Sequence, residues 1–111
     1  MEDWERLMHH IKDEVADAKR YIKDALEIRA TDPETADTYY RLSGEELNHM
    51  NSLHKEVVRI IENCRREKGE TPASMLILYR YLHGEAVEEA EKVGILQACL
   101  LYTSPSPRDV E

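Results

Sequence analysis

The sequence lacks what a sheet protein or a membrane span requires. It has no phenylalanine, one tryptophan, four glycines and four prolines, and 34% of its 111 residues are charged. Because strands favour aromatic and β-branched residues, this composition fits a single all-α domain better than a sheet protein. No apolar run approaches the roughly 20 residues of a transmembrane helix. The opening MEDWERLMHH is acidic and has no apolar segment, so we expect no signal peptide and a cytoplasmic location.

Positive charge is also scarce. Fifteen Lys and Arg face 23 Asp and Glu, which gives a formal net charge of −8. This balance argues against nucleic acid or an anionic membrane as the main partner. An acidic surface is compatible with attracting metal cations, although solubility alone would also explain it.

The two cysteines are Cys64 and Cys99, and the second begins a stretch unlike the rest of the chain. Residues 99–109, CLLYTSPSPRD, resemble the translation of a transposon-type sequencing adaptor in one reading frame. We therefore interpret 99–111 as an artefactual, disordered tail and 1–98 as the domain. This leaves Cys64 alone, so we expect neither an intrachain disulfide nor a cysteine-rich zinc site.

Two proline-bearing junctions divide the domain into helices. In ATDPET, Asp32 is a helix N-cap and Pro33 takes the first helical position. In KGETPAS, Gly69 ends one helix and Pro72 starts the next. Such short connections make neighbouring helices antiparallel. We predict an antiparallel hairpin and a third helix over residues 3–30, 33–68 and 72–97.

Acidic side chains interrupt the apolar stripe of each predicted helix. At about 100° per residue, Glu14 falls within the first stripe and Glu46 near the middle of the second, with His49 at its edge. Glu85 falls within the third stripe, with Glu88 beside it. Because buried carboxylates are costly without a partner, and Glu46 has no Lys or Arg three or four residues away, this coincidence indicates a shared site.

The length of the connections sets which residues meet. If the first hairpin folds about residues 31–32, Glu14 lies opposite His49 and one turn from Glu46. If the second folds near Glu70, Glu88 falls within a turn of His49. A slip of one or two residues changes little, since a helix rises only about 1.5 Å per residue. We therefore expect the carboxylates and the imidazole to converge.

The residue types in this cluster favour a particular metal chemistry. Oxygen-rich sites with one imidazole suit iron or manganese. Di-metal sites in helical bundles use a lone Glu from each of two helices and an E-x-x-H pair from each of two others. Glu46-Leu-Asn-His49 is such a pair, and Glu14 is the lone Glu. With Tyr21 seven residues after Glu14, the pattern resembles the ferritin-like superfamily, including the short encapsulated ferritins.

The resemblance implies roles for these residues. Glu14 and His49 would be terminal metal ligands, Glu46 would bridge two metals, and Tyr21 would assist catalysis as a hydrogen-bond donor beside the ligands. Glu85 and Glu88 are further candidate ligands from the third helix. The implied cofactor is a di-iron centre, with manganese or zinc as alternatives, and the implied activity is oxidation of Fe(II) by O₂ or peroxide.

A single E-x-x-H is half of such a site. A homodimer would supply the second half and complete a four-helix-type bundle, as the short encapsulated ferritins do. A fourth helix beyond Ala98 would be the other solution. We favour the homodimer or a higher homo-oligomer, because three helices with a long exposed apolar stripe need a partner.

Two other interpretations stay open. One is a non-catalytic helical interaction module that keeps a vestigial site, since a fold does not imply a function. The other is a mononuclear zinc or manganese site built from His49, His54 and one Glu. For the ferritin-like interpretation, the location would be the cytoplasm or the inside of a larger protein compartment.

Overall fold

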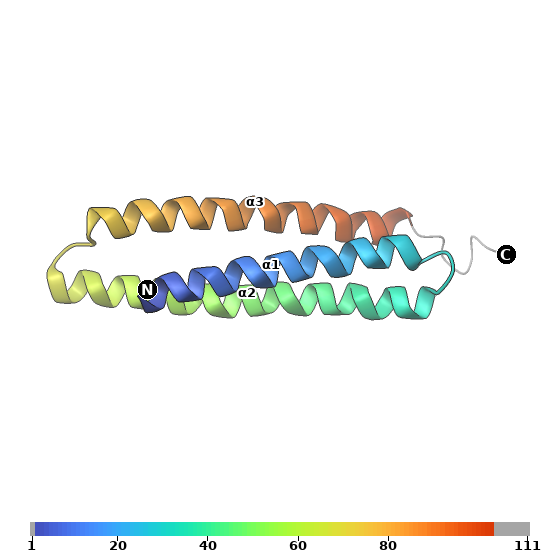
Figure 1. Ribbon diagram of the computed structural model, residues 1–111, viewed down its shortest axis with the longest axis horizontal. Helices are drawn as coiled ribbons and strands as arrows, with labels where there is room; N and C mark the ends of the chain where they lie inside the picture. Colours follow the sequence, from blue (N-terminus) through green and yellow to red (C-terminus); the bar gives the residue numbers. More distant parts are fainter. Residues whose placement is uncertain (1, 104–111) are drawn as a thin grey trace.

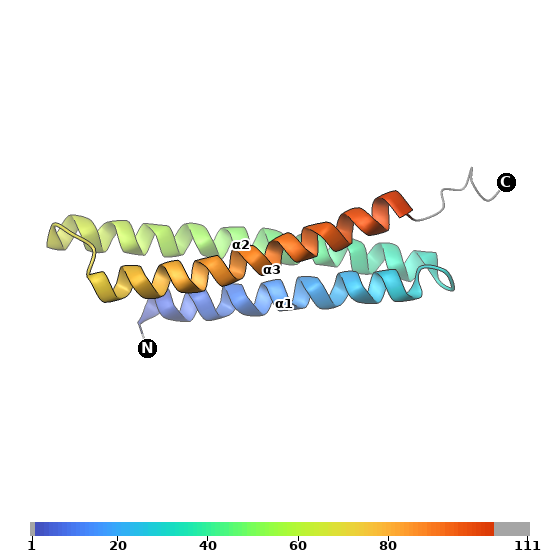
Figure 2. The same ribbon diagram turned by 90° about the horizontal axis from the view of Figure 1, so that it is seen from above.

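The computed structural model describes residues 2–103, which form three long helices (Figure 1). These are α1 (Asp3–Ile28), α2 (Pro33–Lys68) and α3 (Ala73–Thr103). α1 and α2 form an antiparallel hairpin, and α3 lies over this pair and runs in the same direction as α1 (Figure 2). The molecule is an elongated helical bundle with extents of 65 × 18 × 17 Å. The predicted all-helical class is confirmed.

Local capping chemistry explains where α2 begins and ends. The Asp32 carboxylate accepts hydrogen bonds from the backbone N–H of Thr35 at 3.1 Å and from its hydroxyl at 2.6 Å, which satisfies an amide at the helix start. Gly69 ends the helix with φ of 81°, a left-handed conformation that glycine adopts without steric cost. The predicted bounds of α2 are confirmed.

The ends of the other two helices differ from prediction. α1 stops at Ile28, because the amides of Thr31 and Asp32 both turn back to the Ile28 carbonyl. α3 begins one residue later than expected and continues through residues 99–103, which the sequence was expected to leave disordered. There Leu100 is only 6% exposed, because it continues the apolar spacing of the helix. Residues 104–111 lie outside the described part of the chain.

α1 is the central helix of the bundle. Its backbone lies close to those of both other helices, whereas α2 and α3 meet mainly through side chains, as His54 and Tyr79 do. The buried apolar stripe of α1 therefore runs along its whole length and comprises Trp4, Met8, Ile11, Val15, Ala18, Ile22 and Ala25. α2 fully buries only Ala36, Ser43 and Val57, and its larger apolar residues are otherwise partly buried.

One buried polar residue links all three helices. The Ser43 hydroxyl on α2 donates to the Ala18 carbonyl of α1 at 2.7 Å and accepts from Gln97 Nε2 of α3 at 3.1 Å. Because both partners are fixed, this contact aligns the helices at the level where Ser43 is fully buried.

The third helix keeps a second apolar face in solvent. Exposed apolar side chains on α3 include Ile77, Tyr81 and Ile95. Within residues 2–103, no helix combines the length and apolar character that crossing a membrane requires.

Candidate metal centre

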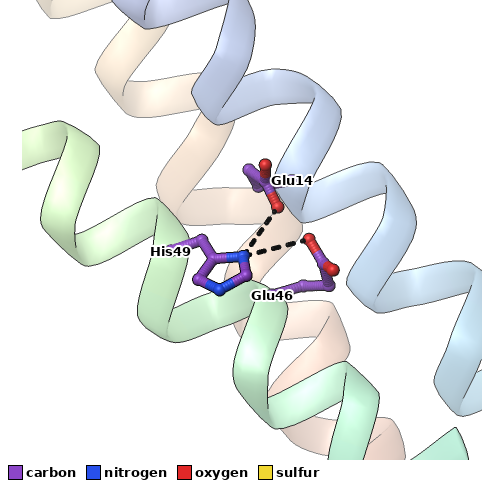
Figure 3. A group of neighbouring side chains, drawn as sticks. All are labelled: Glu14, Glu46 and His49. Atoms are coloured by element: carbon purple, nitrogen blue, oxygen red, sulfur yellow. Dashed lines mark ion pairs between the residues drawn. The ribbon is translucent and has the colours of Figure 1, made fainter.

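Three of the predicted metal ligands lie together between α1 and α2 (Figure 3). Glu46 and His49 project side by side because residues three apart share one face of a helix. Glu14 reaches them from α1, at the level that the short α1–α2 connection sets. His49 Nδ1 lies 3.5 Å from Glu14 Oε2 and 3.7 Å from Glu46 Oε2. One ligand atom from each residue lies within 4.8 Å of the other two.

The two carboxylates are sheltered, and the imidazole stands at the open side of the cluster. The side chains of Glu14 and Glu46 are 26% and 18% exposed, whereas His49 is 60% exposed. Two acidic groups are thus held between α1 and α2. The open side provides access from solvent or from another molecule.

Among residues 2–103, one buried oxygen of the cluster has no hydrogen-bond partner. This atom is Glu14 Oε2, and its 3.5 Å contact with His49 exceeds hydrogen-bond length. A buried carboxylate oxygen without a partner carries a desolvation penalty. A cation between the three residues would remove that penalty.

Pairing with Lys or Arg would be the ordinary alternative for these carboxylates. Within the described residues, the ion pairs of both Glu14 and Glu46 are with His49. One imidazole can offset only one of two negative charges, and only when it is protonated. The donor set therefore fits a divalent cation. Two carboxylates and one imidazole suit iron, manganese or zinc, and three protein ligands leave room for others.

Tyr21, the predicted catalytic hydrogen-bond donor, stacks on Tyr39 of α2. The two ring centroids are 6.1 Å apart with an interplanar angle of 28°. Tyr21 lies two turns after Glu14, a rise of about 10 Å along α1. Tyr21 is thus positioned by its contact with Tyr39 between α1 and α2.

The structure does not bring Glu85 and Glu88 to this cluster. Both are exposed on α3, and the Glu85 carboxylate, through a hydrogen bond, raises the pKa of the nearby Tyr81 hydroxyl. Glu89 is paired instead with Lys92 at 3.0 Å and Lys19 at 3.1 Å, and these contacts lower its pKa.

The reason is the face on which α3 packs. The register estimate set α3 beside α2, but α3 packs mainly on α1 and passes behind the α1–α2 pair when the cluster faces the viewer (Figure 3). A register estimate gives the level of a residue along the bundle, but it does not give the side of the bundle on which the residue lies. Glu89 therefore meets Lys19 of α1, and Glu85 and Glu88 stay exposed.

His54 is not placed for the mononuclear site that was considered for His49, His54 and one Glu. Its Nε2 is hydrogen-bonded to the Tyr79 hydroxyl at 3.0 Å, and its ring stacks on His83. The contact of His54 with Tyr79 and His83 was not predicted from the sequence. It could have been, because a chain reversal near Glu70 sets His54 within one turn of His83 along the bundle.

Comparison with protein-family models, curated proteins and solved structures gives no match to this chain. The ferritin-like resemblance therefore remains a prediction based on Glu14, Tyr21, Glu46 and His49.

Proposed function

We propose that this protein is an iron-binding, ferritin-like protein that oxidises Fe(II) at Glu14, Glu46 and His49. The observation that carries the proposal is the buried Glu14 Oε2, which has no hydrogen-bond partner among residues 2–103 and lies beside a second sheltered carboxylate and an imidazole. Such a cluster is costly without a cation and favourable with one.

Each side chain has a chemical role in this proposal. The carboxylates of Glu14 and Glu46 supply hard oxygen donors that favour Fe(III) over Fe(II), and His49 supplies one nitrogen donor. Two Fe(II) would give two electrons, with two protons from water, either to O₂ to form H₂O₂ or to H₂O₂ to form water. The carboxylates would stabilise the Fe(III) product. Manganese or zinc can occupy the same donors.

A second copy of the chain completes the site in this proposal. A bundle di-metal site uses two lone Glu residues and two E-x-x-H pairs, and this chain contributes one of each. The open side of the cluster, where His49 is 60% exposed, gives a partner copy access to the metals. The partly buried apolar residues of α2 would become fully buried in the resulting four-helix-type core. We expect this homodimer in the cytoplasm or inside a larger protein compartment, without nucleic acid or membrane as partner.

The test is the rate at which Fe(II) is oxidised in air, followed by the absorbance of Fe(III). Glu46→Gln removes one ligand charge with little change in volume and should slow protein-dependent oxidation at least about tenfold. Glu45→Gln is the matched control, because Glu45 is the adjacent, exposed residue. Equal rates for wild type, Glu46→Gln and Glu45→Gln would contradict the proposal.

A second candidate function rests on the outer face of α3. Ile77, Tyr81 and Ile95 are each more than 60% exposed, as in proteins that use an apolar face for binding. A helical interaction module with a vestigial site would expose such a face and would behave identically with and without Fe(II). The oxidation assay distinguishes the two functions.

A further inference from the structure

Two histidines and a tyrosine form a second cluster, between α2 and α3. The His54 and His83 rings stack with centroids 4.8 Å apart and an interplanar angle of 26°. Tyr79 lies against both, with its hydroxyl 3.0 Å from His54 Nε2 and its ring centroid 5.3 Å from that of His83. All three side chains are half-buried. Together with the Gln97–Ser43 hydrogen bond, the cluster connects α2 to α3.

The separation of the two imidazoles is suited to a shared ligand. With metal–nitrogen bonds of about 2.0–2.1 Å and ligand angles of about 90–110°, two imidazoles on one ion have ring centres roughly 4.5–5.2 Å apart. The observed 4.8 Å falls within that range. Because the rings are stacked 26° from parallel, binding one ion would require side-chain rotation that directs one nitrogen of each ring to a common point.

The surroundings of the cluster are partly buried. Burial, and secondarily His83, lowers the pKa of His54 below its ordinary value of 6.5. Burial also raises the pKa of Tyr79.

We propose that His54 and His83 form a binding site for a divalent transition metal that prefers imidazole, such as Zn(II) or Cu(II), with Tyr79 as a positioning residue. His54 binds the ion through Nδ1 and donates its Nε2–H to the Tyr79 hydroxyl, because ligand histidines are commonly oriented through their second nitrogen. A cavity of about 440 Å³ borders the two rings and is lined also by Met8, Met50 and Glu91. It has room for water or a third ligand.

This site is independent of the proposed iron site. It uses nitrogen donors on the α2–α3 side, whereas Glu14 and Glu46 supply oxygen donors between α1 and α2. Imidazole pairs favour late divalent metals and carboxylate pairs favour iron or manganese. Failure of one proposal would leave the other unchanged.

The experiment is calorimetric titration of Zn(II) into metal-free protein carrying Glu14→Gln and Glu46→Gln, which disable the carboxylate cluster. We expect one ion per chain in this parent. Adding His83→Gln should weaken binding at least about 100-fold, and adding Tyr79→Phe about 10- to 100-fold. Adding His9→Gln, at an exposed position of α1, should change nothing. Zinc binding that survives His83→Gln, or that His9→Gln weakens equally, would overturn the proposal.

Two further measurements separate a ligand role from a structural one. Circular dichroism should show unchanged helix content in the metal-free variants. In the wild type, trace Cu(II) should broaden the NMR signals of the His54 and His83 rings and not those of His9. The Cu(II) electron-spin spectrum should show coupling to two nitrogens, retained in Tyr79→Phe with lower affinity. Copper should bind more tightly than zinc, and coupling to fewer than two nitrogens would contradict the assignment.

Discussion

At the scale of the residue, the burial of the Glu14 carboxylate links the stability of the fold to the proposed cation binding. Its Oε2 atom is buried without a hydrogen-bond partner among residues 2–103, and the Glu46 carboxylate is part of the same cluster. In the proposed function, two clustered negative charges would destabilise the metal-free fold and create the affinity for a cation. Sites built for binding commonly sacrifice stability in this way.

We therefore expect Glu14→Gln to stabilise the metal-free protein by about 1 kcal/mol. The amide removes one buried charge at nearly constant volume. Mn(II), which does not change its oxidation state in air under these conditions, should stabilise the wild type and leave the variant unchanged, because only the wild type binds it. Denaturant unfolding with and without Mn(II) measures both effects.

Asp13→Asn is the control for that measurement, since Asp13 is the adjacent, exposed carboxylate. It should leave both the stability and the response to Mn(II) at wild-type values. A Glu14→Gln protein that is less stable without metal, or that gains as much from Mn(II), would refute the link between the buried oxygen and the cation.

The meeting of Glu14, Glu46 and His49 was predictable at this scale, because it depends only on helical spacing and on the length of one connection. Helical spacing sets Glu46 beside His49, and the short connection after α1 sets Glu14 opposite them. The role of Tyr21 was not predictable, because stacking on Tyr39 depends on side-chain rotation, which periodicity does not specify.

At the scale of the element, hydrogen bonds at the ends of the helices set their bounds. The Thr35 hydroxyl, and to a lesser extent its backbone N–H, lowers the pKa of Asp32 from its ordinary 3.8. Because the folded-state pKa is lowered, the ionised carboxylate stabilises the fold above the ordinary value. That contribution is lost as the pH falls through the lowered value.

Asp32→Ala should therefore lower the stability at neutral pH and have little effect in strong acid. The measurement is the denaturant midpoint of both proteins from pH 7 down to about pH 2, well below the ordinary pKa of an aspartate. Asp37→Ala, at an exposed position on α2, should follow the wild type throughout. A difference that persists undiminished in acid would show that Asp32 acts through something other than its charge.

The elements themselves were largely predictable, and their packing only in part. The proline and glycine signals gave the bounds of α2 because each fixes a backbone conformation. The side on which α3 packs was not predictable, because α3 is apolar around much of its circumference and so offers several faces. Glu85 and Glu88, expected at the metal site, are exposed for this reason.

At the scale of the whole molecule, the bundle leaves apolar surface uncovered. α2 is covered mainly by α1, and α3 keeps Ile77, Tyr81 and Ile95 in solvent. A second copy over the cluster of Glu14, Glu46 and His49 would complete both the core and the metal site. The sequence predicts the need for a partner and not its identity, because periodicity shows an apolar face without showing what covers it.

We expect Mn(II) to shift the protein toward a dimer, since an ion bound by residues of two copies stabilises their association. Sedimentation equilibrium with Mn(II) and with a chelator measures the shift. Glu46→Gln should show no response and Glu45→Gln the wild-type response. A protein that stays monomeric with Mn(II), or a shift that Glu46→Gln shares, would exclude a site shared between copies.

The most direct test of the account is anomalous X-ray diffraction at the iron edge from crystals grown with Fe(II). We predict an anomalous peak within bonding distance of Glu14, Glu46 and His49, present in Glu45→Gln and absent in Glu46→Gln. Iron-loaded crystals with no peak between these three side chains would contradict the central claim that they bind a metal.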